Sequence, residues 1–197
     1  MPRPRRQLAD HSCYHLMARG NNRQIVFADE EDHRYFLRHL GDAKARYPAK
    51  LYHYCLMPTH IHLLLEIDRG DELPKLMQAL LQSYGRWYQK RREYVGHVWQ
   101  GRYKSPLVIR ESYFLEAGRY IERNPLRAGM VPDLRGYPWS SYHYYAYGKR
   151  DPLLDEDPYY LQLGPDAVQR QVAYRDFMRL TSPYDGVLDG AFLETPF

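Results

Sequence analysis

The chain has 197 residues, a hydrophobic content of 44%, and a formal net charge of +4 from 28 basic and 24 acidic residues. That length fits one domain with a substantial core. No run of residues approaches the length of about 18 apolar residues that a membrane helix needs, and residues 1–6 lack the apolar segment of a secretory signal. The two cysteines, Cys13 and Cys55, stand alone, which excludes a disulfide framework and a cysteine-based zinc site. We expect a cytoplasmic protein.

Charge is distributed unevenly along the chain. Residues 151–197 hold nine acids and three bases, so residues 1–150 carry an excess of ten positive charges. A basic body favours a polyanionic partner such as nucleic acid, and the 20 tyrosines could stack on unpaired bases. We expect one domain over residues 1–150, with a basic arm over 1–10, and an acidic extension over 151–197. The extension is expected to contain one helix packed on or near the domain, either competing with DNA for the basic surface or burying Tyr174, Phe177, Met178 and Leu180.

The predicted elements alternate in a recognisable order. Strands are predicted over Ser12–Ala18, Leu51–Leu56, His60–Ile67 and Ser105–Ile109. Helices are predicted over Asp29–Tyr47, Asp71–Arg92, Ser112–Asn124 (ended by Pro125) and Asp166–Leu180, with a short helix opening at Trp139–Tyr142. The order β-α-β-β-α-β predicts an α+β protein with a ferredoxin-like antiparallel sheet, two helices on one face and the added helix after the fourth strand on the other.

Two histidines lie on the third predicted strand. Alternate residues of a strand point to the same face, so His60 and His62 are neighbours, whereas Ile61 and Leu63 face the first two helices. Two adjacent imidazoles are suited to binding a metal ion. The other interpretation is a half-exposed strand with two polar residues facing solvent.

The helix after the fourth strand carries Tyr120 and Asn124, which share a face because they are four residues apart. Set over the histidines, the amide oxygen could complete a metal site and the phenol could attack a phosphate. The alternatives are a packing tyrosine and an asparagine typical of a helix end before proline. Tyr35 also has a possible ligand four residues on, His39, but its helix is expected on the opposite face of the sheet.

Four segments of the chain together resemble a known family. They are Leu56–Leu65 (LMPTHIHLLL), Gln100–Ser105 (QGRYKS), Arg119–Pro125 (RYIERNP) and Trp139–Tyr142 (WSSY). In this order they resemble the HUH single-strand DNA transposases, and among them the REP-associated tyrosine transposases. The resemblance covers roughly residues 10–150. Thr59 stands where members often have Asn, and Glu122-Arg123 where many have His-Leu.

The resemblance implies the HUH endonuclease fold and a role for each matched residue. His60, His62 and Asn124 would bind Mg²⁺ or Mn²⁺, and Tyr120 would be the nucleophile. Imidazole also suits zinc, cobalt or nickel, so the residues themselves do not select the metal. The family cuts single-stranded DNA at hairpins of repetitive extragenic palindromes, forming a 5′-phosphotyrosine link and freeing a 3′-OH. By this resemblance we expect a nucleoid-associated enzyme that acts as a monomer rather than a homodimer.

Basic residues in several segments are candidates for DNA contacts. They are Arg3, Arg5, Arg6, Arg19, Arg23, Lys90, Arg91, Arg92, Arg102 and Lys104. Two other functions remain open. A non-catalytic module could bind single-stranded nucleic acid by stacking bases on Tyr52 and Tyr54. A two-histidine phosphoesterase would need a second histidine-containing strand motif, which we do not find in the sequence.

Overall fold

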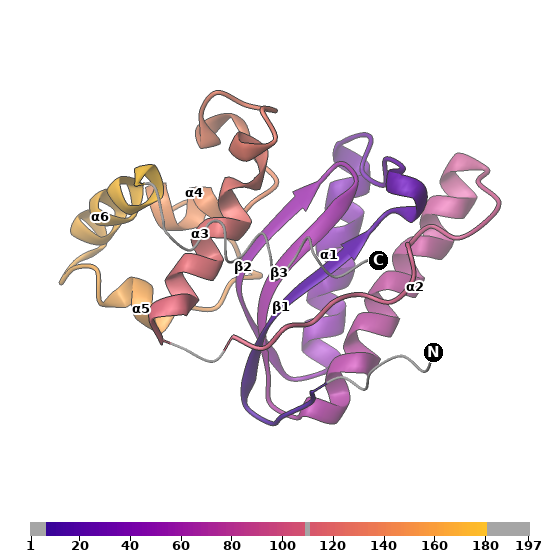
Figure 1. Cartoon of the computed structure of the whole chain (residues 1–197), viewed down its shortest axis with the longest axis horizontal. Coiled ribbons are helices and arrows are strands. Elements are labelled where there is room, and N and C mark those ends of the chain that lie inside the picture. Colours follow the sequence, from indigo (N-terminus) through magenta and orange to yellow (C-terminus); the bar gives the residue numbers. More distant parts are fainter. Residues whose placement is uncertain (1–6, 109–110, 181–197) are drawn as a thin grey trace.

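The computed structural model describes residues 7–108 and 111–180 (Figure 1). It confirms an α+β protein with an antiparallel sheet. The strands are β1 (Ser12–Arg19), β2 (Ala49–Met57) and β3 (His60–Ile67), in the order β1-β3-β2. The bounds of β3 match the prediction, and β1 and β2 each extend slightly beyond the predicted segments. Because successive side chains of a strand point to opposite faces of the sheet, His60 and His62 lie on one face of β3.

Helices α1 (Glu30–Arg46) and α2 (Leu73–Arg92) pack together on one face of the sheet (Figure 1). Asp29 caps the N-terminus of α1. Its side chain accepts a hydrogen bond from the backbone N–H of Asp32, and the Asp32 side chain accepts one from the backbone N–H of Asp29. Buried side chains of both helices meet Ile61, Leu63 and Leu65 of β3 in the main core. This face is therefore apolar, as the strand pattern predicted.

The predicted fourth strand is an extended segment rather than a regular strand. Residues 104–108 lie beside β1 through two isolated bridges, Met17 to Lys104 and Tyr14 to Leu107. Pro106 lies between the bridges and accepts from His15 N through its carbonyl, but it has no N–H to donate. The proline interrupts the hydrogen-bond ladder while the segment keeps the fourth position of the ferredoxin-like sheet. The predicted end, Ile109, lies outside the described residues.

Helix α3 (Glu111–Arg127) covers the other face of the sheet and packs mainly on β2 (Figure 1). The prediction that Pro125 ends this helix was wrong, because Pro125 lies inside it. Proline removes the N–H that would reach the carbonyl of Ile121. The side-chain Nδ2 of Asn124 donates to that carbonyl at 3.2 Å and to the carbonyl of Tyr120 at 2.8 Å. The asparagine side chain therefore replaces the missing donor, and the helix continues for two residues.

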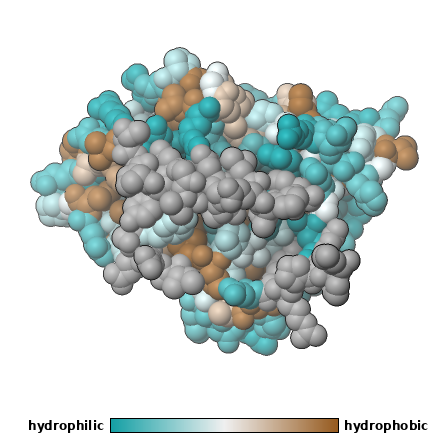
Figure 2. Space-filling view, in the orientation of Figure 1, coloured by the Kyte–Doolittle hydropathy of each residue, from teal (hydrophilic) through white to brown (hydrophobic). Residues whose placement is uncertain are grey.

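Three further helices pack on the outer side of α3. They are α4 (Tyr142–Tyr147), α5 (Pro158–Leu161) and α6 (Ala167–Arg179), and three short 3-10 turns span Asn21–Arg23, Gly70–Glu72 and Leu134–Gly136. Tyr145, Tyr160 and Tyr174 form a buried aromatic cluster between α4, α5 and α6. Among the described residues, no helix combines the length and apolar character that crossing a bilayer requires. On the face shown in Figure 2, hydrophobic residues lie in separate patches among hydrophilic ones.

A buried polar cluster joins α3 to β2 and to the C-terminal extension. His53 of β2 hydrogen-bonds Glu122 of α3 through Nδ1 (2.8 Å) and Asp157 through Nε2 (3.0 Å). Ser141 Oγ and Tyr174 Oη donate to the two oxygens of Glu122, at 2.5 and 2.8 Å. Because a buried carboxylate is costly without such partners, this cluster fixes the position of α3.

The acidic extension contacts the fold through its carboxylates. Asp151 accepts from Tyr54 Oη at 2.8 Å, and Asp155 accepts from Leu51 N at 2.9 Å and pairs with Lys44. These contacts lie on β2 and α1 and involve none of the basic residues predicted to bind DNA. The described part of the extension, residues 151–180, thus packs on the same core.

We predict that stability depends on the ionisation of His53. Burial lowers the pKa of His53, but the hydrogen bonds to Asp157 and Glu122 outweigh it and raise the pKa from 6.5 to about 9. The contribution of protonated His53 to the free energy of unfolding should be complete below pH 6.5. It should fall by on the order of 3 kcal/mol as the pH rises toward 9 and beyond. Denaturant unfolding across this range measures it. His53→Gln should flatten the pH dependence, whereas His11→Gln, at an exposed site, should not.

We also predict that a chain ending at residue 150 loses its cooperative unfolding transition. It would leave His53 without Asp157, Glu122 without Tyr174, and Tyr145 without the rings of Tyr160 and Tyr174. Thermal melting of this truncated chain is the measurement. A truncated chain that melts as cooperatively as the full chain would show that the extension is dispensable for folding.

Candidate active site

The histidine pair lies where β3 emerges from the turn after β2. His60 is opposite Arg19 of β1 and Met57 of β2, and His62 is opposite Met17 and Cys55. The two rings are 5.0 Å apart between centroids. His62 is buried and His60 half-buried, so the pair lies under the edge of α3 with His60 toward the exterior.

Helix α3 brings Tyr120 against these histidines. The Tyr120 ring is buried, with its centroid 6.1 Å from that of His62. The guanidinium of Arg127, two turns along the helix, lies 4.9 Å from the centroid of the Tyr120 ring. A cation at this position would stabilise either a phenolate or a phosphate next to the ring. The structure thus brings together three of the four residues predicted to perform the chemistry.

A third histidine, His15 of β1, joins the site and was not predicted. Its Nε2 is 2.9 Å from His62 Nδ1, and its ring centroid is 5.9 Å from that of Tyr120. Both imidazoles are buried. The sequence contains only a weak indication of this role for His15, because it is a single histidine on the first strand. Its position near His62 follows only from the register between β1 and β3.

The three histidines are neutral near pH 7. Burial lowers the pKa of His15 to about 3 and, together with the charge of Arg19, the pKa of His60 to about 4. Burial lowers the pKa of His62 well below its ordinary value, and the positive charges of Arg19 and Arg127 lower it further. Neutral imidazole is the form that binds a metal ion, so the burial that disfavours protonation also keeps these ligands available.

The hydrogen bond between His15 and His62 restricts which nitrogen could face a cation. His62 Nδ1 is occupied by this bond, which leaves Nε2 as the ligand atom. For Nε2 to offer a lone pair, the proton of His62 must lie on Nδ1 and point at His15. His15 then accepts through Nε2 and holds His62 in the tautomer that metal binding requires.

The remaining predicted ligand, Asn124, is less directly placed. Its amide nitrogen donates to Tyr120 and Ile121 carbonyls, so Oδ1 is the atom that could bind a cation. We find no contact between Asn124 and either His60 or His62 in residues 7–108 and 111–180. In the same part of the chain, no group of three or more His, Cys, Asp or Glu side chains is arranged to hold a metal. The donor set fits an ion bound by two imidazoles and neutral oxygens, with positions open to water and phosphate.

The basic residues predicted to contact DNA differ in their surroundings. Arg19 and Lys104 are half-buried at the sheet edge near His60, and Arg23, Lys90 and Arg102 are exposed. Arg91 and Arg92 are instead held by Asp29 and Asp32 at the start of α1, over 2.6–2.9 Å. These ion pairs join α2 to α1. Arg3, Arg5 and Arg6 lie outside the described residues.

Comparison with known proteins bears on the family and the fold of this chain. The family model for IS200-like transposases matches residues 9–124. A protein of Haemophilus influenzae named as a REP-associated tyrosine transposase is 28% identical over 109 residues, which cover 49% of this chain and 61% of that protein. The chain thus matches somewhat less than two thirds of the length of this curated relative.

A solved structure of a REP-associated tyrosine transposase bound to a REP hairpin has the same fold. It superposes with a TM-score of 0.62 at 19% sequence identity, covering 80% of this chain and 93% of the other. This match confirms the HUH fold predicted from the motifs. The family model spans more than half of the residues and includes His60, His62 and Tyr120, so the chain belongs to the IS200-like transposase family.

Proposed function

We propose that this protein is a REP-associated tyrosine transposase that nicks and rejoins single-stranded DNA at hairpins of the repetitive extragenic palindrome type. The observation that carries this proposal is that Tyr120 of α3 lies against His62 of β3, with the guanidinium of Arg127 next to the Tyr120 ring. A tyrosine, a neutral histidine pair and a cation meet the needs of phosphodiester cleavage: a nucleophile, a site for a Lewis acid and charge neutralisation.

In the proposed reaction, Tyr120 Oη attacks the scissile phosphorus. An O–P bond forms to the 5′-phosphate and the bond to the 3′-oxygen breaks, which leaves a 5′-phosphotyrosine and a free 3′-OH. For strand transfer, a 3′-OH attacks the same phosphorus and Tyr120 leaves as the phenol. Arg127 and Arg19 neutralise charge on the phosphate. The phosphoester energy is retained in the covalent link, so joining needs no nucleotide cofactor.

Mg²⁺ or Mn²⁺ is the cofactor that this proposal requires. His60 and His62 would hold it, with Asn124 Oδ1 as the third protein ligand. When bound, such an ion polarises the phosphate and favours the phenolate. His15 would not touch the ion, and would act by holding the tautomer of His62 through the hydrogen bond to Nδ1.

The competing functions fit the structure less well. Tyr52 and Tyr54 are buried, and their hydroxyls donate to Glu66 and Asp151 at 2.8 Å, so neither ring is available to stack on bases.

Tyr35, the alternative nucleophile, belongs to α1 and stacks on Trp87 of α2. Both helices lie on the face of the sheet opposite α3 (Figure 1). Tyr120 also reaches the histidines of its own chain, which supports action as a monomer.

We predict that Tyr120→Phe abolishes cleavage while hairpin affinity stays within about twofold, because only the phenol oxygen is removed. Incubation with a labelled hairpin and Mn²⁺, followed by denaturing electrophoresis, detects the covalent adduct. Tyr35→Phe is the matched control and should cleave normally. An undiminished adduct in Tyr120→Phe would assign the nucleophile to another residue.

We predict that His15→Ala weakens Mn²⁺ binding by about 10- to 100-fold, as commonly follows when a histidine ligand loses the hydrogen-bond partner of its other ring nitrogen. His15→Gln should restore part of the affinity, since its amide oxygen can accept from His62 Nδ1. Titration calorimetry with Mn²⁺ measures the effect independently of cleavage. Wild-type cleavage should stop in excess EDTA, and cleavage that persists would remove the metal from the mechanism.

A further inference from the structure

The turn between β2 and β3 places a hydroxyl group against one of the predicted metal ligands. Thr59 is the last residue of this turn, and His60 begins β3. Thr59 Oγ1 lies 2.9 Å from His60 Nδ1. Both residues are half-buried, so the imidazole at this end of the strand is not held by tight packing alone. Thr59 therefore engages one of the two ring nitrogens of His60.

Hydrogen bonds to the backbone of the turn fix the position of this hydroxyl. The carbonyl of Pro58 accepts from Val26 N and Phe27 N, at 2.8 and 3.0 Å. The carbonyl of Thr59 accepts from Gly20 N at 2.7 Å. Three N–H groups from another part of the chain thus hold the two turn residues.

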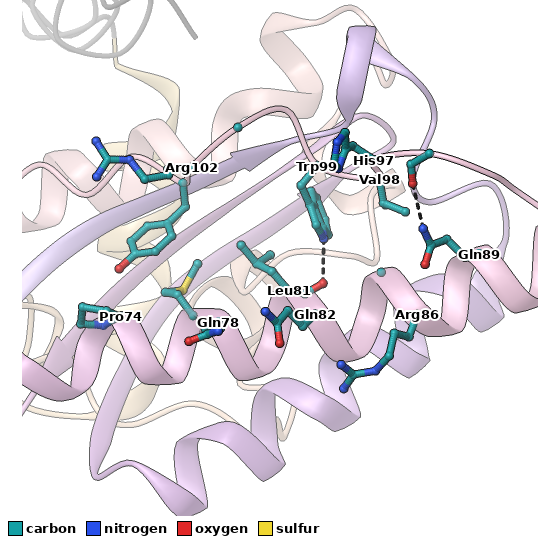
Figure 3. Close-up of a pocket in the computed structure, with 15 residues that line it drawn as sticks. Pro74, Gln78, Leu81, Gln82, Arg86, Gln89, His97, Val98, Trp99 and Arg102 are labelled. Atoms are coloured by element: carbon teal, nitrogen blue, oxygen red, sulfur yellow. Dashed lines mark hydrogen bonds between the residues drawn. The ribbon is translucent and has the colours of Figure 1, made fainter. Parts of the chain in front are cut away.

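The segment that holds the turn is itself attached to α2. Tyr88 Oη donates to the carbonyl of Ile25 at 2.8 Å, and Gly20 forms a bridge with Trp99. Trp99 Nε1 in turn donates to the carbonyl of Leu81 at 2.9 Å (Figure 3). The position of the turn therefore follows from contacts within the fold, and the hydroxyl is in place before any ligand binds.

Both predicted histidine ligands now have the same ring nitrogen engaged. His62 Nδ1 lies 2.9 Å from His15 Nε2, and His60 Nδ1 lies 2.9 Å from Thr59 Oγ1. The remaining nitrogen on each ring is Nε2, and the ring centroids are 5.0 Å apart. Nε2 offers a lone pair only when the proton lies on Nδ1, and a hydroxyl oxygen can accept that proton in a hydrogen bond.

We propose that Thr59 is a positioning residue for the metal ion, because its hydroxyl accepts from His60 Nδ1 and commits Nε2 to the ion. Histidine ligands of metals almost always donate their other N–H to such a partner, which fixes the tautomer and the orientation of the ring. This inference rests on the proposed function for the identity of the ion. Asparagine, which the resemblance leads us to expect at this position, has an amide oxygen that can accept the same hydrogen bond.

The test compares variants of Thr59 in the full chain without DNA. Thr59→Val keeps the shape of the side chain and removes the hydroxyl, so titration calorimetry should show the Kd for Mn²⁺ rising by about 10- to 100-fold. Thr59→Ser and Thr59→Asn keep an oxygen that can accept, and should stay within about threefold of wild type. Thermal melting shows whether each variant is folded, and Thr59→Ala replaces Thr59→Val if the latter is not.

A second measurement identifies the nitrogen that binds the ion. Zn²⁺ is a diamagnetic probe that also binds imidazole, and nitrogen NMR of protein labelled in its histidine rings reports each ring nitrogen separately. In wild type, Zn²⁺ should shift the Nε2 signals of both His60 and His62. In Thr59→Val the shift at His60 Nε2 should shrink while that at His62 is kept. A purely structural role for Thr59 would change neither ring selectively.

Three results would overturn the proposal. They are a folded Thr59→Val with the wild-type affinity for Mn²⁺, a wild-type His60 that binds Zn²⁺ through Nδ1, and a Thr59→Ser variant as weak as Thr59→Val. A wild-type protein that binds neither ion would overturn it as well, together with the proposed cofactor.

The adduct assay separates this proposal from the proposed function. If Thr59→Val weakens Mn²⁺ binding and Thr59→Ser restores it, but the wild-type protein forms no adduct with a hairpin, the positioning role stands and the cleavage function fails. If the wild-type protein forms metal-dependent adducts while Thr59→Val binds Mn²⁺ as tightly as wild type, the cleavage function stands and the positioning role fails.

Discussion

The position of α3, the helix that carries Tyr120, depends on one buried carboxylate. Glu122 lies two residues after Tyr120 on α3, and it has no access to water. Its cost of burial is offset only when His53, Ser141 and Tyr174 meet its oxygens. Residues two apart on a helix point in nearly opposite directions, so fixing Glu122 toward β2 and the extension turns Tyr120 toward His62. Gly118 permits this packing, because a Cβ there would lie 2.5 Å from the His53 ring.

This arrangement makes the C-terminal extension part of the active-site scaffold. Asp157 and Tyr174 come from segments far along the chain, yet they complete the cluster that holds α3. Glu122 also stands where the resemblance leads us to expect histidine. In this chain the side chain at that position instead links α3 to the C-terminal extension through Tyr174. The tyrosine is thereby held over the histidines of the same chain.

The two faces of the sheet have different roles in the proposed function. On the face under α3, burial lowers the pKa of His15, His60 and His62, and neutral imidazoles are suited to metal binding. The face under α1 and α2 forms the main core, and at its edge α2 presents glutamines and an arginine toward residues 96–103. Arg19 stands between the two regions.

Local periodicity in the sequence determined much of the site. The two-residue repeat of β3 puts His60 beside His62, and the helical repeat puts Tyr120 beside Asn124, whatever else the chain does. The sequence did not reveal His15, because its hydrogen bond to His62 depends on the register between β1 and β3. Nor did it reveal the partners of Glu122, the ion pairs of Arg91 and Arg92, or the donation by Asn124 that carries α3 past Pro125. Each of these depends on side-chain geometry that pattern alone does not fix, and most join segments distant in sequence, so only the tertiary structure decided them.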